Sequence, residues 1–79
     1  MQKRIMEVPT IELHNGEIAK AGDIIIDKHG NTYLIMAIGE NVGMVEIIHD
    51  EEFDMDEYKK PIWLNENIVS KHFTIDYRA

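Results

Sequence analysis

The strongest constraint on the fold is a pair of short runs that are apolar on both faces of an extended strand. Residues 32–38 (TYLIMAI) are apolar at almost every odd and even position, and Glu46 alone interrupts residues 44–48 (MVEII). A sheet with one face in water alternates apolar and polar side chains along each strand. Something must therefore cover the second face, either a barrel that folds over itself or a partner chain.

Turn residues separate these runs from other short β-rich segments. Asn15-Gly16 follows the alternating residues 10–14, and this pair suits the positive φ angles of a tight hairpin turn. The β-branched residues 24–26 favour extended backbone, and residues 28–31 and 39–43 supply two more turns. The spacing predicts a mainly β fold: a small SH3-like or related barrel of five to six short antiparallel strands with at most one short helical turn.

The last third of the chain contains the only predicted helical segment. Residues 61–64 suit a strand that begins at or lies on an edge because they start with proline, and Asn65 can cap one helical turn over residues 67–69. Residues 71–77 then alternate as a final strand. The alternative is a longer helix over residues 64–75, which has only a patchy apolar stripe.

Length and composition predict one soluble domain over residues 1–79. A chain of 79 residues buries only about 60–65% of its unfolded surface, and this one has no cysteine for a disulfide or a thiolate metal site. The basic N-terminus lacks the apolar region of a signal peptide, and the longest apolar run, residues 33–38, is far shorter than the ~20 residues that span a bilayer. We expect a cytoplasmic protein with no membrane partner.

The residues that catalysis or metal binding would need are not grouped in the sequence. Ser70, the only serine, lies two residues before His72 and would share a strand face with it, but no orienting acid or oxyanion hole can be located. The alternating acids from Asp50 to Asp56 resemble the start of a calcium-binding EF-hand loop. That pattern fails, because Met55 takes the glycine position and Pro61 takes the final glutamate position. We expect no catalytic residues, no metal and no cofactor.

All of the net charge lies in one twelve-residue window. The chain carries 15 acids and 8 bases, a formal net charge of −7, and residues 46–57 hold seven acids and no lysine or arginine. The remaining residues balance eight acids against eight bases. Like charges four residues apart disfavour a helix here, so the sequence predicts an irregular or extended acidic loop. The candidate partner-binding residues are Glu46, Asp50, Glu51, Glu52, Phe53, Asp54, Met55, Asp56 and Glu57.

Two interpretations of the window compete. In the simpler one, Phe53 and Met55 pin a surface loop onto the core while the acids stay in water. In the functional one, the carboxylates steer a basic protein surface into contact and the apolar side chains supply the buried contact. Such a partner is often a nucleic-acid-binding protein, whose phosphate-binding groove the carboxylates would occupy. In size, acidity and lack of cysteine the chain resembles the small acidic inhibitors encoded by viruses, phages included.

Two further function classes remain open. The doubly apolar strands 32–38 and 44–48 are typical of a structural module that assembles with a second chain, for example as a homodimer. A nucleic-acid-binding barrel would use a patch of bases and aromatics, although the net charge opposes a nucleic-acid partner. That patch would comprise Lys59, Lys60, Trp63, Lys71, Phe73 and Arg78.

Overall fold

Eight short strands and one helix account for most of residues 8–79, the part of the chain that the computed structural model describes. The strands are β1 (Thr10–Glu12), β2 (Ile18–Lys20), β3 (Ile24–Asp27), β4 (Thr32–Ile38), β5 (Asn41–Asp50), β6 (Met55–Tyr58), β7 (Ile62–Asn65) and β8 (Phe73–Tyr77), with α1 (Glu66–His72) between the last two. The mainly β prediction is confirmed. The strand count exceeds the five or six expected, because β2 and β6 form from residues whose pattern did not predict a strand.

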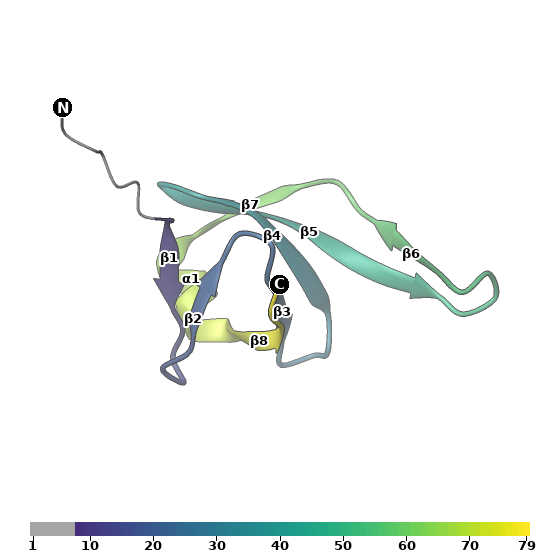
Figure 1. Ribbon diagram of the computed structural model, residues 1–79, viewed down its shortest axis with the longest axis horizontal. Helices are drawn as coiled ribbons and strands as arrows, with labels where there is room; N and C mark the ends of the chain where they lie inside the picture. The colour runs from purple at the N-terminus through teal and green to yellow at the C-terminus, as the bar shows by residue number, and fades with distance from the viewer. Residues whose placement is uncertain (1–7) are drawn as a thin grey trace, which may run out of the picture.

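The strands form two antiparallel sheets (Figure 1). β1 and β2 make a small hairpin, and the larger sheet has the order β6-β5-β4-β3-β8. β5 is ten residues long and pairs with two strands on the same side: β7 along residues 41–44 and β6 along residues 47–50. Residues 59–61 carry the chain from one of these partners to the other.

The larger sheet does not close into a barrel. β7 pairs with β5 and β8 pairs with β3, while no pairing joins β7 to β8 within residues 8–79. The predicted barrel closure is therefore not observed. The helix α1 occupies the connection between these two strands, and its seven residues make about two turns rather than the single turn expected.

Asn65 caps the N-terminus of α1, as predicted. Its side-chain oxygen accepts a hydrogen bond from the backbone N–H of Asn67 at 2.8 Å, which satisfies one of the free donors at the helix start. The helix ends at His72 and the next residue, Phe73, is already extended. The longer helix over residues 64–75 is therefore wrong, and the last strand starts two residues later than expected.

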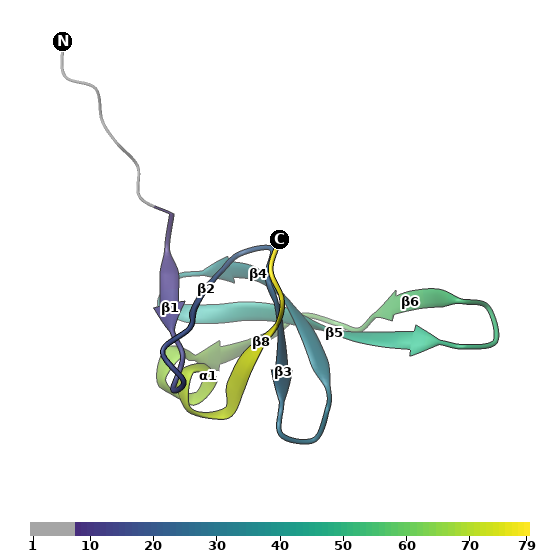
Figure 2. The same cartoon turned by 60° about the horizontal axis from the view of Figure 1, so that its bottom comes forward.

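The core lies on the concave face of the larger sheet, where β1, β2 and α1 cover it (Figures 1 and 2). Ile35 and Met44 face each other across β4 and β5 and are almost fully buried, and the ring of Tyr33 meets Phe73 edge-on at 5.4 Å. The buried core consists of Ile11, Leu13, Ala19, Ile25, Ile35, Val42, Met44, Val69 and Phe73.

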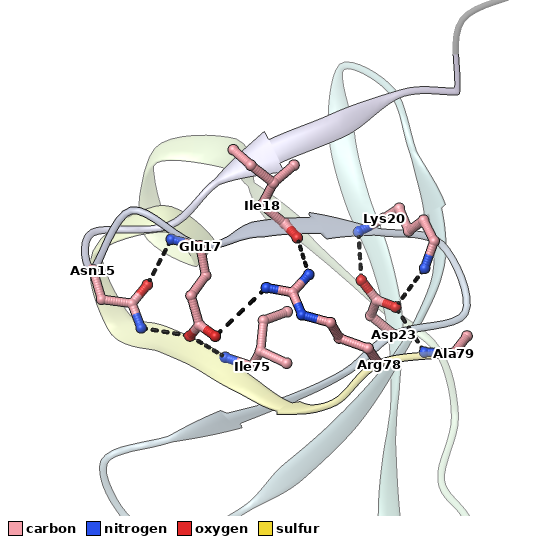
Figure 3. A network of polar contacts seen from close by, with 8 residues as sticks. All are labelled: Asn15, Glu17, Ile18, Lys20, Asp23, Ile75, Arg78 and Ala79. Atoms are coloured by element: carbon pink, nitrogen blue, oxygen red, sulfur yellow. Dashed lines mark hydrogen bonds and ion pairs between the residues drawn. The ribbon is translucent and has the colours of Figure 1, made fainter.

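A buried carboxylate ties the last described residues to the β2–β3 turn (Figure 3). Asp23 is fully buried, and its two oxygens accept hydrogen bonds from the Lys20 N–H at 3.0 Å, the Lys20 Nζ at 2.8 Å and the Ala79 N–H at 3.0 Å. Burial by itself raises the pKa of this carboxyl group. The donors from Lys20 and Ala79 outweigh burial and hold the pKa below its ordinary value of 3.8.

Candidate functional site

The acidic window forms a β-hairpin, so of the irregular or extended loop that we expected, the backbone is extended on both sides of a short turn. Its first residues extend β5, residues 51–54 form the turn, and the remainder lies in β6, with Ile48 opposite Glu57 and Asp50 opposite Met55. Ile47 and Ile48 favour extended backbone. The residues of β6 have a lower strand propensity and are held extended by cross-strand pairing with β5. The hairpin projects from the body (Figures 1 and 2), and the radius of gyration of 14.0 Å exceeds the roughly 12 Å of a compact chain of this length.

Two of the acids shape the turn of this hairpin. The Asp50 carboxylate accepts hydrogen bonds from the backbone N–H of Glu52 at 3.0 Å and of Phe53 at 3.4 Å. Asp54 has a φ of +50°, and aspartate tolerates this left-handed conformation better than most residues. Local backbone requirements therefore explain an aspartate at both positions.

A histidine holds two of the carboxylates close together across the hairpin. His49 Nδ1 lies 2.9 Å from Asp56 Oδ1, and its Nε2 lies 3.3 Å from Asp54 Oδ1. Each ring nitrogen of His49 therefore faces a carboxylate oxygen, one of Asp56 and one of Asp54. Asp54 and Asp56 thus have a partner within the hairpin itself.

Three acids and two apolar side chains of the hairpin remain without such a role. Glu51, Glu52 and Glu57 make no ion pair with any residue in 8–79. Phe53 is 67% exposed and Met55 is 60% exposed. The expectation that these two residues pin the segment onto the core is therefore wrong, because their side chains project into solvent.

Glu46, the remaining candidate, lies at the base of the hairpin and apart from its tip. It faces Tyr33 across β4 and β5, and its carbonyl accepts a hydrogen bond from the Lys59 N–H at 3.0 Å. An open hollow of about 550 Å³ adjoins it, lined by Tyr33, Glu46, Tyr58, Lys59, Lys60 and Ile62. Burial, followed by the charges of Glu46 and Asp27, raises the pKa of Tyr33. The hollow therefore has the carboxylate of Glu46 beside the aromatic ring of Tyr33.

The pairing of Ser70 with His72 on a strand face is wrong. Both residues lie in α1, where positions two apart point in different directions. The Ser70 hydroxyl instead donates to the Glu12 carbonyl at 2.7 Å and fastens the helix to β1. Among residues 8–79, no three metal-ligating side chains come together as a metal site would require.

The basic and aromatic residues considered for nucleic-acid binding have separate environments. Phe73 is buried in the core, and the Arg78 guanidinium donates to the Ile18 carbonyl at 2.9 Å and lies 3.6 Å from Glu17. Trp63 is 62% exposed and its six-membered ring lies against Gly43 of the neighbouring strand. The sequence alone did not decide whether Trp63 is buried or exposed. Its pairing with Gly43 indicates an aromatic ring on the surface of the sheet, but this pairing is known only once the β5–β7 register is known.

Comparisons with protein-family models, with curated proteins and with solved structures gave no match to this chain. Within the described residues, no helix has the length and apolar character needed to cross a membrane.

Proposed function

We propose that the protein is a non-enzymatic interaction domain whose acidic hairpin binds a basic surface of another protein. The observation that carries the proposal is the exposure of Phe53 and Met55 at the tip of a projecting hairpin that has seven acids and no lysine or arginine over residues 46–57. A hairpin that only needed to stay in water would have no use for two large apolar side chains there. Together they form a contact surface with an acidic surround.

The charge of the hairpin supports a basic partner. Glu51, Glu52 and Glu57 have no ion-pair partner in residues 8–79, so their field is not neutralised locally. A concentrated field of one sign raises the association rate of a partner of the opposite sign and disfavours like-charged competitors. Where the partner is a nucleic-acid-binding protein, these carboxylates would occupy the positions of backbone phosphates and inhibit it.

The rigidity of the turn supports tight binding. Asp50 fixes the backbone of residues 52 and 53, and His49 links the two strands through Asp54 and Asp56. A segment that is already ordered loses less conformational entropy when it binds. Phe53 and Met55 are thereby presented in a fixed arrangement, as binding hot spots require.

We also propose that the body is an open relative of the SH3-like barrel. Strands β3, β4 and β5 pair in chain order, β7 pairs with β5 after the β6 excursion, and a short helix precedes a last strand that returns to β3. In this interpretation the β5–β6 hairpin is an extension of one strand of that framework.

The proposal is tested by selecting peptides from a displayed random library with the full chain as bait. We expect enrichment of peptides that combine lysine or arginine with an apolar residue. The test variant is Glu51→Gln/Glu52→Gln/Glu57→Gln, which leaves the turn hydrogen bonds and the His49 bridge in place. The matched control is Glu12→Gln/Glu40→Gln/Glu66→Gln, which removes the same charge from exposed positions elsewhere.

The selected peptides should bind the test variant roughly tenfold more weakly, with a shallower salt dependence, and bind the control as they bind the wild type. Phe53→Ser should weaken binding by a similar factor with the salt dependence unchanged, because it removes an apolar contact. Enrichment of peptides without basic residues, no enrichment at all, or equal loss in test and control would overturn the proposal.

A further inference from the structure

The convex face of the larger sheet, opposite the core, is largely apolar, and residues of six strands contribute to it. The register places its side chains in three cross-strand rows without a charged residue, and the next pair on this face, His49 with Asp56, carries a carboxylate and belongs to the acidic hairpin. The first row is Trp63, Gly43 and Ala37; the second is Val45, Leu34, Ile24 and Tyr77; the third is Tyr58, Ile47, Thr32, Ile26 and Thr74.

No described element covers this face. The β1–β2 hairpin and α1 lie on the other side of the sheet, against the core (Figure 1). Trp63 and Tyr77 are each about 60% exposed, as are Met36, which lies at the register shift beside Ala37, and Tyr58, which also borders the hollow beside Glu46. The largest apolar patch on a soluble monomer is typically about 300–600 Å² and is often a binding surface.

The exposed area is close to what a dimer interface needs. Aromatic side chains of this size bury about 150–250 Å² each, so three of them at the observed exposure offer about 350 Å². Met36 and the partly exposed aliphatic residues between them bring the face to roughly 600 Å² per chain. Two such faces give about 1,200 Å² in total, the lower end for specific protein interfaces.

We propose that this face pairs with the same face of a second copy of the chain. A second copy is favoured because the rows are free of charge, so two identical faces meet without repulsion although each chain has a net charge of −7. The three rows have no charged side chain that an oppositely charged partner could bind. A two-fold axis that sets the two β5 strands antiparallel also sends the acidic hairpins to opposite ends, where they remain accessible.

Sedimentation equilibrium of the full chain over the micromolar range tests this pairing. We expect the wild type to be a dimer and Met36→Lys/Trp63→Lys to dissociate roughly a hundredfold more readily, because it places two charges per chain in an apolar interface. The matched control is Phe53→Lys/Met55→Lys, which makes the same chemical change at the exposed hairpin tip. It should remain a dimer.

Trp63 is the only tryptophan, so its fluorescence reports on the interface without any substitution. Diluting the wild type should shift its emission to longer wavelength as the ring becomes exposed, in step with the loss of dimer mass. A wild type that stays monomeric throughout, a dimer with no emission change on dilution, or equal dissociation of both lysine variants would overturn the proposal. None of these results bears on peptide binding by the hairpin.

Discussion

At position 43 the lack of a side chain lets Trp63 lie against the sheet. A Cβ atom built there would lie 2.7 Å from Cζ3 and 2.8 Å from Cη2 of the indole, well inside van der Waals contact. The φ of Gly43 is not in the left-handed region, so the glycine is explained by this close approach and not by backbone conformation.

Gly43→Ala should therefore move the indole off the sheet and cost about 1 kcal/mol of unfolding free energy, as in other overpacked sites. The measurement is chemical denaturation together with the Trp63 emission wavelength, which should shift to the red. Gly39→Ala is the control, since a Cβ there would have no neighbour within 4 Å. An unchanged emission in Gly43→Ala would show that the ring does not rest on this glycine.

Asp23 should give the fold a distinct acid sensitivity. Its folded-state pKa lies below the ordinary value of 3.8, so its stabilising contribution is complete above that value and is lost as pH falls through the folded pKa. Asp23→Asn should cost about 2 kcal/mol at neutral pH, because three donors lose a charged acceptor, and the gap from the wild type should vanish in acid. Urea unfolding across pH measures this difference, with the exposed Asp76→Asn as control; a gap independent of pH would contradict it.

Sequence reasoning succeeded for the strands whose own residues have a high strand propensity. Residues 32–38 form β4 with the expected bounds, and the Asn65 cap is confirmed. It failed at β6, whose sequence MDEY has weak strand propensity and is extended only because it pairs with β5. It could not foresee that Phe53 and Met55 point into solvent, since that follows from the direction in which the hairpin leaves the body.

The hairpin should be dispensable for folding. No residue from 48 to 58 belongs to the core, and Ile48 opposite Glu57 is a suitable pair for a shorter turn. Replacing residues 49–56 by Asn-Gly, the preferred two-residue hairpin turn, should leave cooperative thermal unfolding with a midpoint within a few degrees of the wild type. Loss of a cooperative transition would show that the hairpin is part of the folding unit.

Contacts between residues distant in sequence join the β1–β2 hairpin to β8 and to Arg78, which follows it. Glu17 accepts a hydrogen bond from the Ile75 N–H at 3.3 Å, and Arg78 donates to the Ile18 carbonyl at 2.9 Å, although these partners lie about sixty positions apart in sequence (Figure 3). The small β1–β2 sheet shares no strand pairing with the larger one. Its position therefore depends on such contacts and on the core residues beneath it.

Glu17→Ala/Arg78→Ala should loosen this hairpin selectively. We expect faster amide hydrogen exchange in β1 and β2, because the substitution removes contacts that favour the closed position of this hairpin, while the central strands β4 and β5, which do not use these contacts, keep their protection. Glu12→Ala/Lys71→Ala, at exposed positions with no ion pair in residues 8–79, is the control. Equal acceleration in all strands would indicate global destabilisation and contradict the prediction.

The single strand β5 has a mechanical consequence. Its ten residues span about 34 Å and run without interruption from the core at Val42 and Met44 to the acidic turn. A protein bound at the hairpin tip would therefore be connected to the body by an extended strand and not by a flexible linker. The angle between that bound protein and the rest of the molecule would be fixed by the pleat of one strand. A force on the bound protein would act first on the hydrogen bond between Lys59 and Glu46, where the pairing of β5 passes from β6 to β7.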